Sequence, residues 1–158
     1  QVHGTLYKVP QYRFRNESVI FQGMYCLPQQ GDAEGLSDES PIDLPVEKSD
    51  FIRFLKVLYP LRSNEPTGTC EEWTSVLKLS TMWGFKGIRD LCIAQMDPLI
   101  GDLDPVEKVV LAHRYEIEAW FLDGLNQLVQ ASKMVPQVEW NQVGWSIDWI
   151  FRLVTIRE

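Results

Sequence analysis

The chain has 158 residues, of which 45% are hydrophobic, and a formal net charge of −7. This length indicates one domain, or one domain with an appended subdomain, and the hydrophobic content is too high for a disordered chain. The charge excludes a broad phosphate-binding face, because binding of nucleic acid needs clustered Lys and Arg. We therefore expect a folded protein that binds no nucleic acid.

Two short extended elements are predicted near the N-terminus. Residues 2–9 favour β-structure around a turn at His3-Gly4, which indicates a hairpin. After a loop over residues 27–40, Ile42–Leu44 form a second short strand. A sheet this small can only be a cap on a helical core.

Helical periodicity, N-terminal caps and helix-stopping Pro and Gly residues predict the other elements. They are helices over residues 11–16, 19–25, 50–59, 70–83, 86–96, from 105 on, 118–129, 136–143 and 145–157. Ser18 and Ser49 are the expected caps of the second and third of these helices. The fourth helix begins with the capping-box spacing of Thr69 and Glu72.

Acidic residues are concentrated in one segment. Seven acids lie between Asp32 and Asp50, and Lys48 is the only base among them. The simpler interpretation is a solvated loop that keeps the protein soluble. The alternative is a docking surface for a basic partner, in which Asp32 and Glu34 are candidate contact residues.

The sequence carries no recognisable catalytic or metal-binding pattern. It has no Gly-x-Ser-x-Gly elbow, no phosphate-binding loop and no His-Glu-x-x-His pair. His3 and His113 lie far apart in the chain, and Cys26, Cys70 and Cys92 have neither zinc nor disulfide spacing. We therefore predict no enzymatic activity, no catalytic residue, no cofactor and no metal site. The cysteines indicate a reducing, intracellular compartment, and no run of 18 apolar residues predicts a membrane span.

Tryptophans crowd the last third of the chain. They are Trp120, Trp140, Trp145 and Trp149. Two interpretations remain open: these side chains form part of a helical core, or they form an exposed aromatic patch of the kind enriched in binding hot spots.

A series of short motifs follows in order along the chain. The motifs are Leu6-Tyr-Lys-Val-Pro10, Phe21-x-x-Met24, Pro41-Ile-x-Leu44, Leu58-Tyr-Pro60 and Val76-Leu-Lys-Leu-Ser80-x-Met-Trp83. Together they resemble the BTB/POZ domain, in the divergent form abundant in fungi. The resemblance implies an α+β fold over residues 1–100, in which a small N-terminal sheet of short strands caps a helical core. It implies an all-helical extension over residues 101–158.

BTB/POZ domains bind other proteins. The resemblance therefore implies a non-enzymatic protein–protein interaction module that acts in scaffolding or self-association. A homodimer is one expected state, although the strand that such dimers exchange would lie before Gln1.

A second function implied by the resemblance is that of a substrate adaptor, which recruits a cullin-type ubiquitin ligase. Met24, Tyr25 and Leu27 would then contact the cullin, while Gln29 stands where cullin-binding relatives carry Glu. A remote alternative of another class is a small helical enzyme or ligand carrier. It would predict a sizeable apolar pocket with convergent polar groups.

Overall fold

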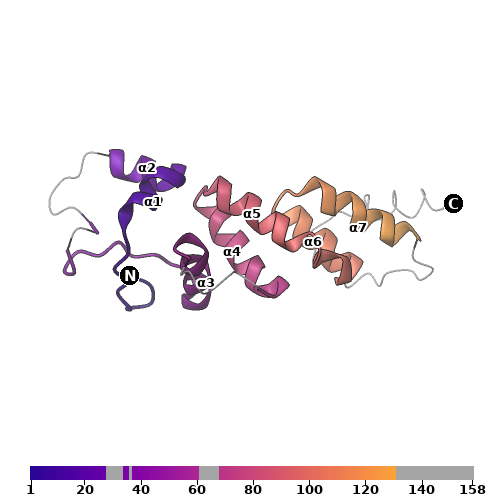
Figure 1. Ribbon diagram of the computed structural model, residues 1–158, viewed down its shortest axis with the longest axis horizontal. Helices are drawn as coiled ribbons and strands as arrows, with labels where there is room; N and C mark the ends of the chain where they lie inside the picture. Colours follow the sequence, from indigo (N-terminus) through magenta and orange to yellow (C-terminus); the bar gives the residue numbers. More distant parts are fainter. Residues whose placement is uncertain (28–33, 36, 61–67, 131–158) are drawn as a thin grey trace. The chain divides into compact units, whose positions relative to one another are not determined.

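The structure is a computed structural model that describes residues 1–27, 34–35, 37–60 and 68–130 (Figure 1). The chain divides into two compact units, Gln1–Pro98 and Leu99–Glu158. Seven α-helices lie in the described ranges, five in the first unit and two in the second. The predicted helices over residues 136–143 and 145–157 lie outside the described residues, as do Trp140, Trp145 and Trp149.

The helices of the first unit follow one another with short connections. They are α1 (Gln11–Glu17), α2 (Val19–Cys26), α3 (Lys48–Leu58), α4 (Cys70–Met82) and α5 (Lys86–Met96). Helix α1 packs against α2, and α4 packs between α3 and α5 (Figure 1). The core of this unit therefore joins helices that are neighbours in the sequence.

Local caps explain where several helices begin. The Ser18 hydroxyl accepts a hydrogen bond from the Phe21 amide at the start of α2, as predicted. Thr69 and Glu72 form the predicted capping box of α4. The predicted cap of α3 is wrong, because this helix begins at Lys48, before Ser49.

Six aromatic side chains form the centre of the first unit. They are Phe14 of α1, Phe21 of α2, Phe51 and Phe54 of α3, and Trp83 and Phe85 of the turn between α4 and α5. The Phe54 ring lies 5.2 Å from the Trp83 ring and 5.1 Å from the Phe85 ring, in both cases edge to face. Such pairs stabilise the fold by about 0.5–1.5 kcal/mol beyond the burial of their area. This aromatic core connects all five helices of the unit.

The predicted N-terminal sheet is wrong, and with it the α+β fold that the resemblance implied. The described residues contain no β-strand, only an isolated antiparallel bridge between Val2 and Thr5. The predicted turn between them is confirmed, since His3 and Gly4 have positive φ values of 45° and 72°. Within the described part of the chain, the segment after this turn pairs with no second strand, so the hairpin is not formed.

The predicted strand over Ile42–Leu44 is not formed, and this segment makes backbone hydrogen bonds to Gln1 instead. The Gln1 amino group donates to the Ile42 carbonyl, and the Leu44 amide donates to the Gln1 carbonyl at 2.9 Å. Pro41 and Pro45 bracket this segment, and neither has an N–H group to extend a ladder of hydrogen bonds. The prolines therefore prevent a strand where hydrophobicity alone favours one.

The second unit contains two described α-helices, α6 (Pro105–Arg114) and α7 (Glu118–Gln130), after a short 3₁₀ helix over Ile100–Asp102. The two helices pack along their apolar sides. Gly124 allows a close approach, since a Cβ atom there would lie 2.7 Å from Cγ2 of Val109. Trp120 is buried.

An ion pair between a buried lysine and an exposed aspartate links α6 to α7. The Lys108 side chain is 0% exposed, and its Nζ lies 2.6 Å from Oδ2 of Asp123. Gln127 donates a second hydrogen bond to the same oxygen at 3.0 Å. Because an unpaired buried ammonium is costly, this pair ties the two helices to one register.

The aromatic core predicts that substitutions at two positions of α3 differ widely in their effect on the free energy of unfolding. Phe54 is 0% exposed and Ile52 is 37% exposed. We expect Phe54→Ala to lower the free energy of unfolding by about 3–5 kcal/mol, because it leaves a cavity, and Ile52→Ala to lower it by less than about 1 kcal/mol. Urea unfolding measures both variants. Similar losses in the two variants would mean that the buried face of α3 is misassigned.

An ion pair between Asp50 and Lys78 connects α3 to α4. Oδ2 of Asp50 lies 2.8 Å from Nζ of Lys78. Burial raises the pKa of this carboxyl, but hydrogen bonds from Lys78 and Ser75 and the charge of Arg53 outweigh burial and hold the pKa below its ordinary value. The ionised carboxylate therefore stabilises the folded state.

The lowered pKa of Asp50 predicts a loss of stability in acid. This contribution is complete above the unfolded pKa, which is about 3.9, and disappears as the pH falls through the lower folded value. We expect Asp50→Asn to lower the free energy of unfolding by about 1–2 kcal/mol at neutral pH, with the deficit shrinking below about pH 4. Urea unfolding across pH tests this, with the exposed Asp90→Asn as the control. A deficit that does not change with pH would contradict it.

Candidate functional site

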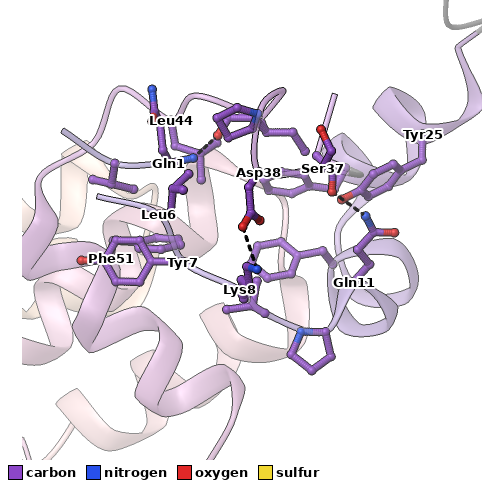
Figure 2. A pocket seen from close by; sticks show the side chains of 18 residues that line it. Gln1, Leu6, Tyr7, Lys8, Gln11, Tyr25, Ser37, Asp38, Leu44 and Phe51 are labelled. Carbon is purple, nitrogen blue, oxygen red and sulfur yellow. Dashed lines mark hydrogen bonds and ion pairs between the residues drawn. The ribbon is translucent and has the colours of Figure 1, made fainter. Parts of the chain in front are cut away.

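A cavity opens in the first unit between two segments that lie far apart in the sequence (Figure 2). We call this cavity, of about 530 Å³, the N-terminal groove. One wall is the segment Leu6–Pro10, and the other is formed by Gly35, Ser37, Asp38, Pro41, Ile42 and Leu44. Phe14, Phe21 and Phe51 of the aromatic core close its inner end. The volume lies within the range of roughly 300–1,000 Å³ that is common for ligand pockets.

The two walls are joined at their ends and remain apart between them. At one end, Gln1 pairs with the backbone of Ile42 and Leu44. At the other end, Nε2 of Gln11 donates to the Gly35 carbonyl at 3.4 Å. Figure 2 shows Gln1 and Leu44 on one side of the groove and Gln11 on the other. This arrangement leaves room for a further segment of chain between the walls.

The first wall presents unused backbone groups. In the part of the chain that the structure describes, no backbone amide or carbonyl from Leu6 to Val9 takes part in a hydrogen bond. These residues are exposed or half-buried, so water can satisfy the groups in the free protein. An extended segment with such free groups is a template for pairing with another strand.

A single ion pair crosses the groove. Nζ of Lys8 lies 2.8 Å from Oδ2 of Asp38, and Figure 2 shows the two side chains pointing toward one another. Their side chains are 77% and 56% exposed. A pair this exposed contributes little to stability, so an incoming charged group can replace either partner.

Tyr25 of α2 lines the groove near Gln11 (Figure 2). Burial raises the pKa of Tyr25, and the positive charge of Arg15, which lies 4.9 Å from the ring, only partly offsets this effect. The hydroxyl therefore stays protonated at neutral pH and can donate a hydrogen bond.

The second wall is acidic. Residues 34–47 include five acids and no base among all fourteen positions of the sequence. These acids are Glu34, Asp38, Glu39, Asp43 and Glu47, and each is exposed. Asp38 lines the groove, and Glu34, Glu39 and Asp43 are each next to a residue that lines it. Their charges give this edge of the groove, the rim, a negative potential.

Only some of the predicted site residues lie at this groove. Tyr25 lines it, and Glu34 lies exposed beside Gly35 of the second wall. Met24 is half-buried and Leu27 is 66% exposed, and neither lines the groove. The remaining candidate, Asp32, lies outside the described residues.

Sequence reasoning missed Leu6, Tyr7 and Asp38 as site residues. The motif that begins at Leu6 was interpreted as a strand of a sheet, and its role as the wall of a groove depends on the lack of a pairing partner. Asp38 belongs to the acidic segment that the charge count identifies, but no sequence pattern indicates its contact with Lys8.

Three other kinds of site are relevant to the described residues: a metal site, a membrane-spanning helix and a reactive cysteine. Within these ranges no three His, Cys, Asp or Glu side chains lie together as a metal site, and no helix is long and apolar enough to cross a membrane. Burial raises the pKa of the Cys92 thiol to about 12, so it is not a thiolate at neutral pH.

Comparison with known proteins adds no assignment: no protein-family model, curated protein or solved structure matches this chain. The N-terminal groove is the feature of the described residues that combines a cavity with unused backbone groups, and it is therefore the candidate functional site.

The Tyr7 hydroxyl gives a prediction about the wall of the groove. The Tyr7 ring packs edge to face on Phe51 at 5.0 Å, and its buried hydroxyl has no hydrogen-bond partner within the described residues. We expect Tyr7→Phe to raise the free energy of unfolding by about 1 kcal/mol, because it removes an unsatisfied polar group. The control is Tyr59→Phe, which should lower it by about 1 kcal/mol because the Tyr59 hydroxyl donates to the Pro10 carbonyl. A loss of stability in Tyr7→Phe, measured by urea unfolding, would contradict this account.

Proposed function

We propose that this chain is a non-enzymatic protein–protein interaction module whose binding surface is the N-terminal groove. The observation that carries the proposal is the backbone of Leu6 to Val9, which makes no hydrogen bond to any described residue, beside a cavity of about 530 Å³. An extended segment of another protein can bond to such a backbone as an added strand, while its side chains fill the cavity.

The residues that line the groove support binding over catalysis. They include no His and no Cys, and their opposite charges form an exposed ion pair between Lys8 and Asp38. A nucleophile held beside a general base, the usual arrangement for covalent catalysis, is not among them. The apolar walls instead offer area that a partner can bury.

The motifs that resemble those of BTB/POZ proteins support the same function through their order in the sequence. They favour scaffolding or self-association, within an intracellular compartment. Recruitment of a cullin is the alternative, with Met24, Tyr25 and Leu27 as contacts. Of these three, Leu27 alone is largely exposed, which favours scaffolding over the cullin alternative.

The volume of the groove favours one further candidate, a carrier of a small apolar ligand. The cavity size falls in the range of ligand pockets, and Gln11 and Tyr25 supply polar groups at its edge. This candidate leaves the free backbone of Leu6 to Val9 without a role. Protein binding accounts for both features and is therefore the stronger proposal.

Sedimentation velocity over a wide concentration range tests self-association, and titration calorimetry against the N-terminal domain of a BTB-binding cullin tests the alternative. We expect reversible self-association that Leu6→Asp weakens by about tenfold or more, equal to 1.4 kcal/mol, because it places a charge on the apolar wall. Leu91→Asp on α5 is the matched control, since Leu91 is 39% exposed and Leu6 is 47% exposed. A monomer at every concentration together with no heat from the cullin would contradict the proposed function.

A further inference from the structure

We infer that the N-terminal groove binds a short, extended, basic peptide segment of a partner protein, in which Lys or Arg alternates with apolar residues. This inference rests on the proposed function, and it names the chemistry of the partner. Three independent features of the groove carry it: the free backbone of one wall, the apolar lining of the cavity and the acidity of the other wall.

The backbone of the first wall sets the conformation of the partner. Leu6 to Val9 carry amides and carbonyls that make no hydrogen bond within the described residues. Four residues of extended chain span roughly 13 Å, at about 3.3 Å per residue. An extended peptide of similar length can pair with this wall, whereas a helix has no free backbone groups along its side.

The lining of the groove sets the spacing of the apolar residues in the partner. Leu6, Val9, Ile42 and Leu44 contribute apolar side chains along the walls, and Phe14 lies at the inner end. Along an extended peptide, successive side chains point to opposite sides. Every second side chain would therefore enter the cavity, and those between would face the rim.

The rim sets the charge of the partner. Asp38 lines the groove and is paired with Lys8 of the opposite wall. Glu34, Glu39 and Asp43 are exposed next to residues that line the groove, and the sequence has no base between positions 34 and 47. A Lys or Arg side chain pointing out of the cavity would meet this negative potential and form charge-assisted hydrogen bonds. A peptide with Glu at the same positions would be repelled.

The direct test is fluorescence anisotropy with a dye-labelled peptide, acetyl-Leu-Lys-Val-Arg-Val-Lys-amide. Two matched peptides are compared with it. The first has Glu in place of every Lys and Arg. The second has N-methyl groups on the backbone nitrogens of both edges of the strand, so that neither edge can donate hydrogen bonds. We expect micromolar binding of the basic peptide and at least about tenfold weaker binding of the other two, equal to 1.4 kcal/mol. Binding of the basic peptide should weaken as the salt concentration rises.

Charge reversal on the protein locates the contact. Asp43→Lys changes an exposed acid between Ile42 and Leu44, which both line the groove, and Asp90→Lys changes an exposed acid of α5, no residue of which lines the groove. We expect the first variant to bind the basic peptide at least about fivefold more weakly, about 1 kcal/mol, and the second to bind it as the wild type does. Because both positions are exposed, urea unfolding should give both variants nearly wild-type stability.

Each other result overturns the inference in a distinct way. Equal binding of the basic and acidic peptides would exclude charge recognition, and undiminished binding of the N-methylated peptide would exclude strand addition. Binding of a small apolar dye with no binding of any peptide would assign the groove to a ligand carrier. Self-association or cullin binding without peptide binding would overturn this inference and leave the proposed function in place.

Discussion

The first unit depends on one cluster of edge-to-face aromatic contacts. Phe54 lies at its centre and contacts Trp83 and Phe85, which hold the turn between α4 and α5 against α3. Phe14 and Phe21 extend the cluster to α1 and α2 and also close the inner end of the N-terminal groove. The same contacts therefore stabilise the helices and shape the cavity, because a loss of packing at the centre would move the rings that line it.

Prolines and a few backbone contacts shape the N-terminal groove beside this core. Pro10 and Pro41 lie in the opposite walls and lack the N–H groups that a continuous ladder would need. Gln1 and Gln11 join the walls at the two ends, and the Lys8–Asp38 pair is too exposed to close the space between them. Among the described residues, the features that prevent an N-terminal sheet therefore also leave a groove whose first wall has unpaired backbone groups.

The sequence predicted those elements that local interactions determine. The start of α2 follows from Ser18, and the capping box of α4 follows from Thr69 and Glu72. The sheet was wrong because alternation of apolar residues shows an extended segment but not whether a partner strand lies beside it. Most of the groove was missed for the same reason, since its walls meet only through long-range contacts, and Tyr25 alone of the predicted site residues lines it.

Amide hydrogen exchange at Leu6 to Val9 tests the central claim most directly. These amides make no hydrogen bond within the described residues, so we expect fast exchange in the free protein. On addition of the basic peptide at saturating concentration, alternate amides of this segment should exchange at least about tenfold more slowly, because those that face the groove gain a partner. Unchanged exchange at all four amides, with the peptide bound, would place the binding surface elsewhere and contradict the account.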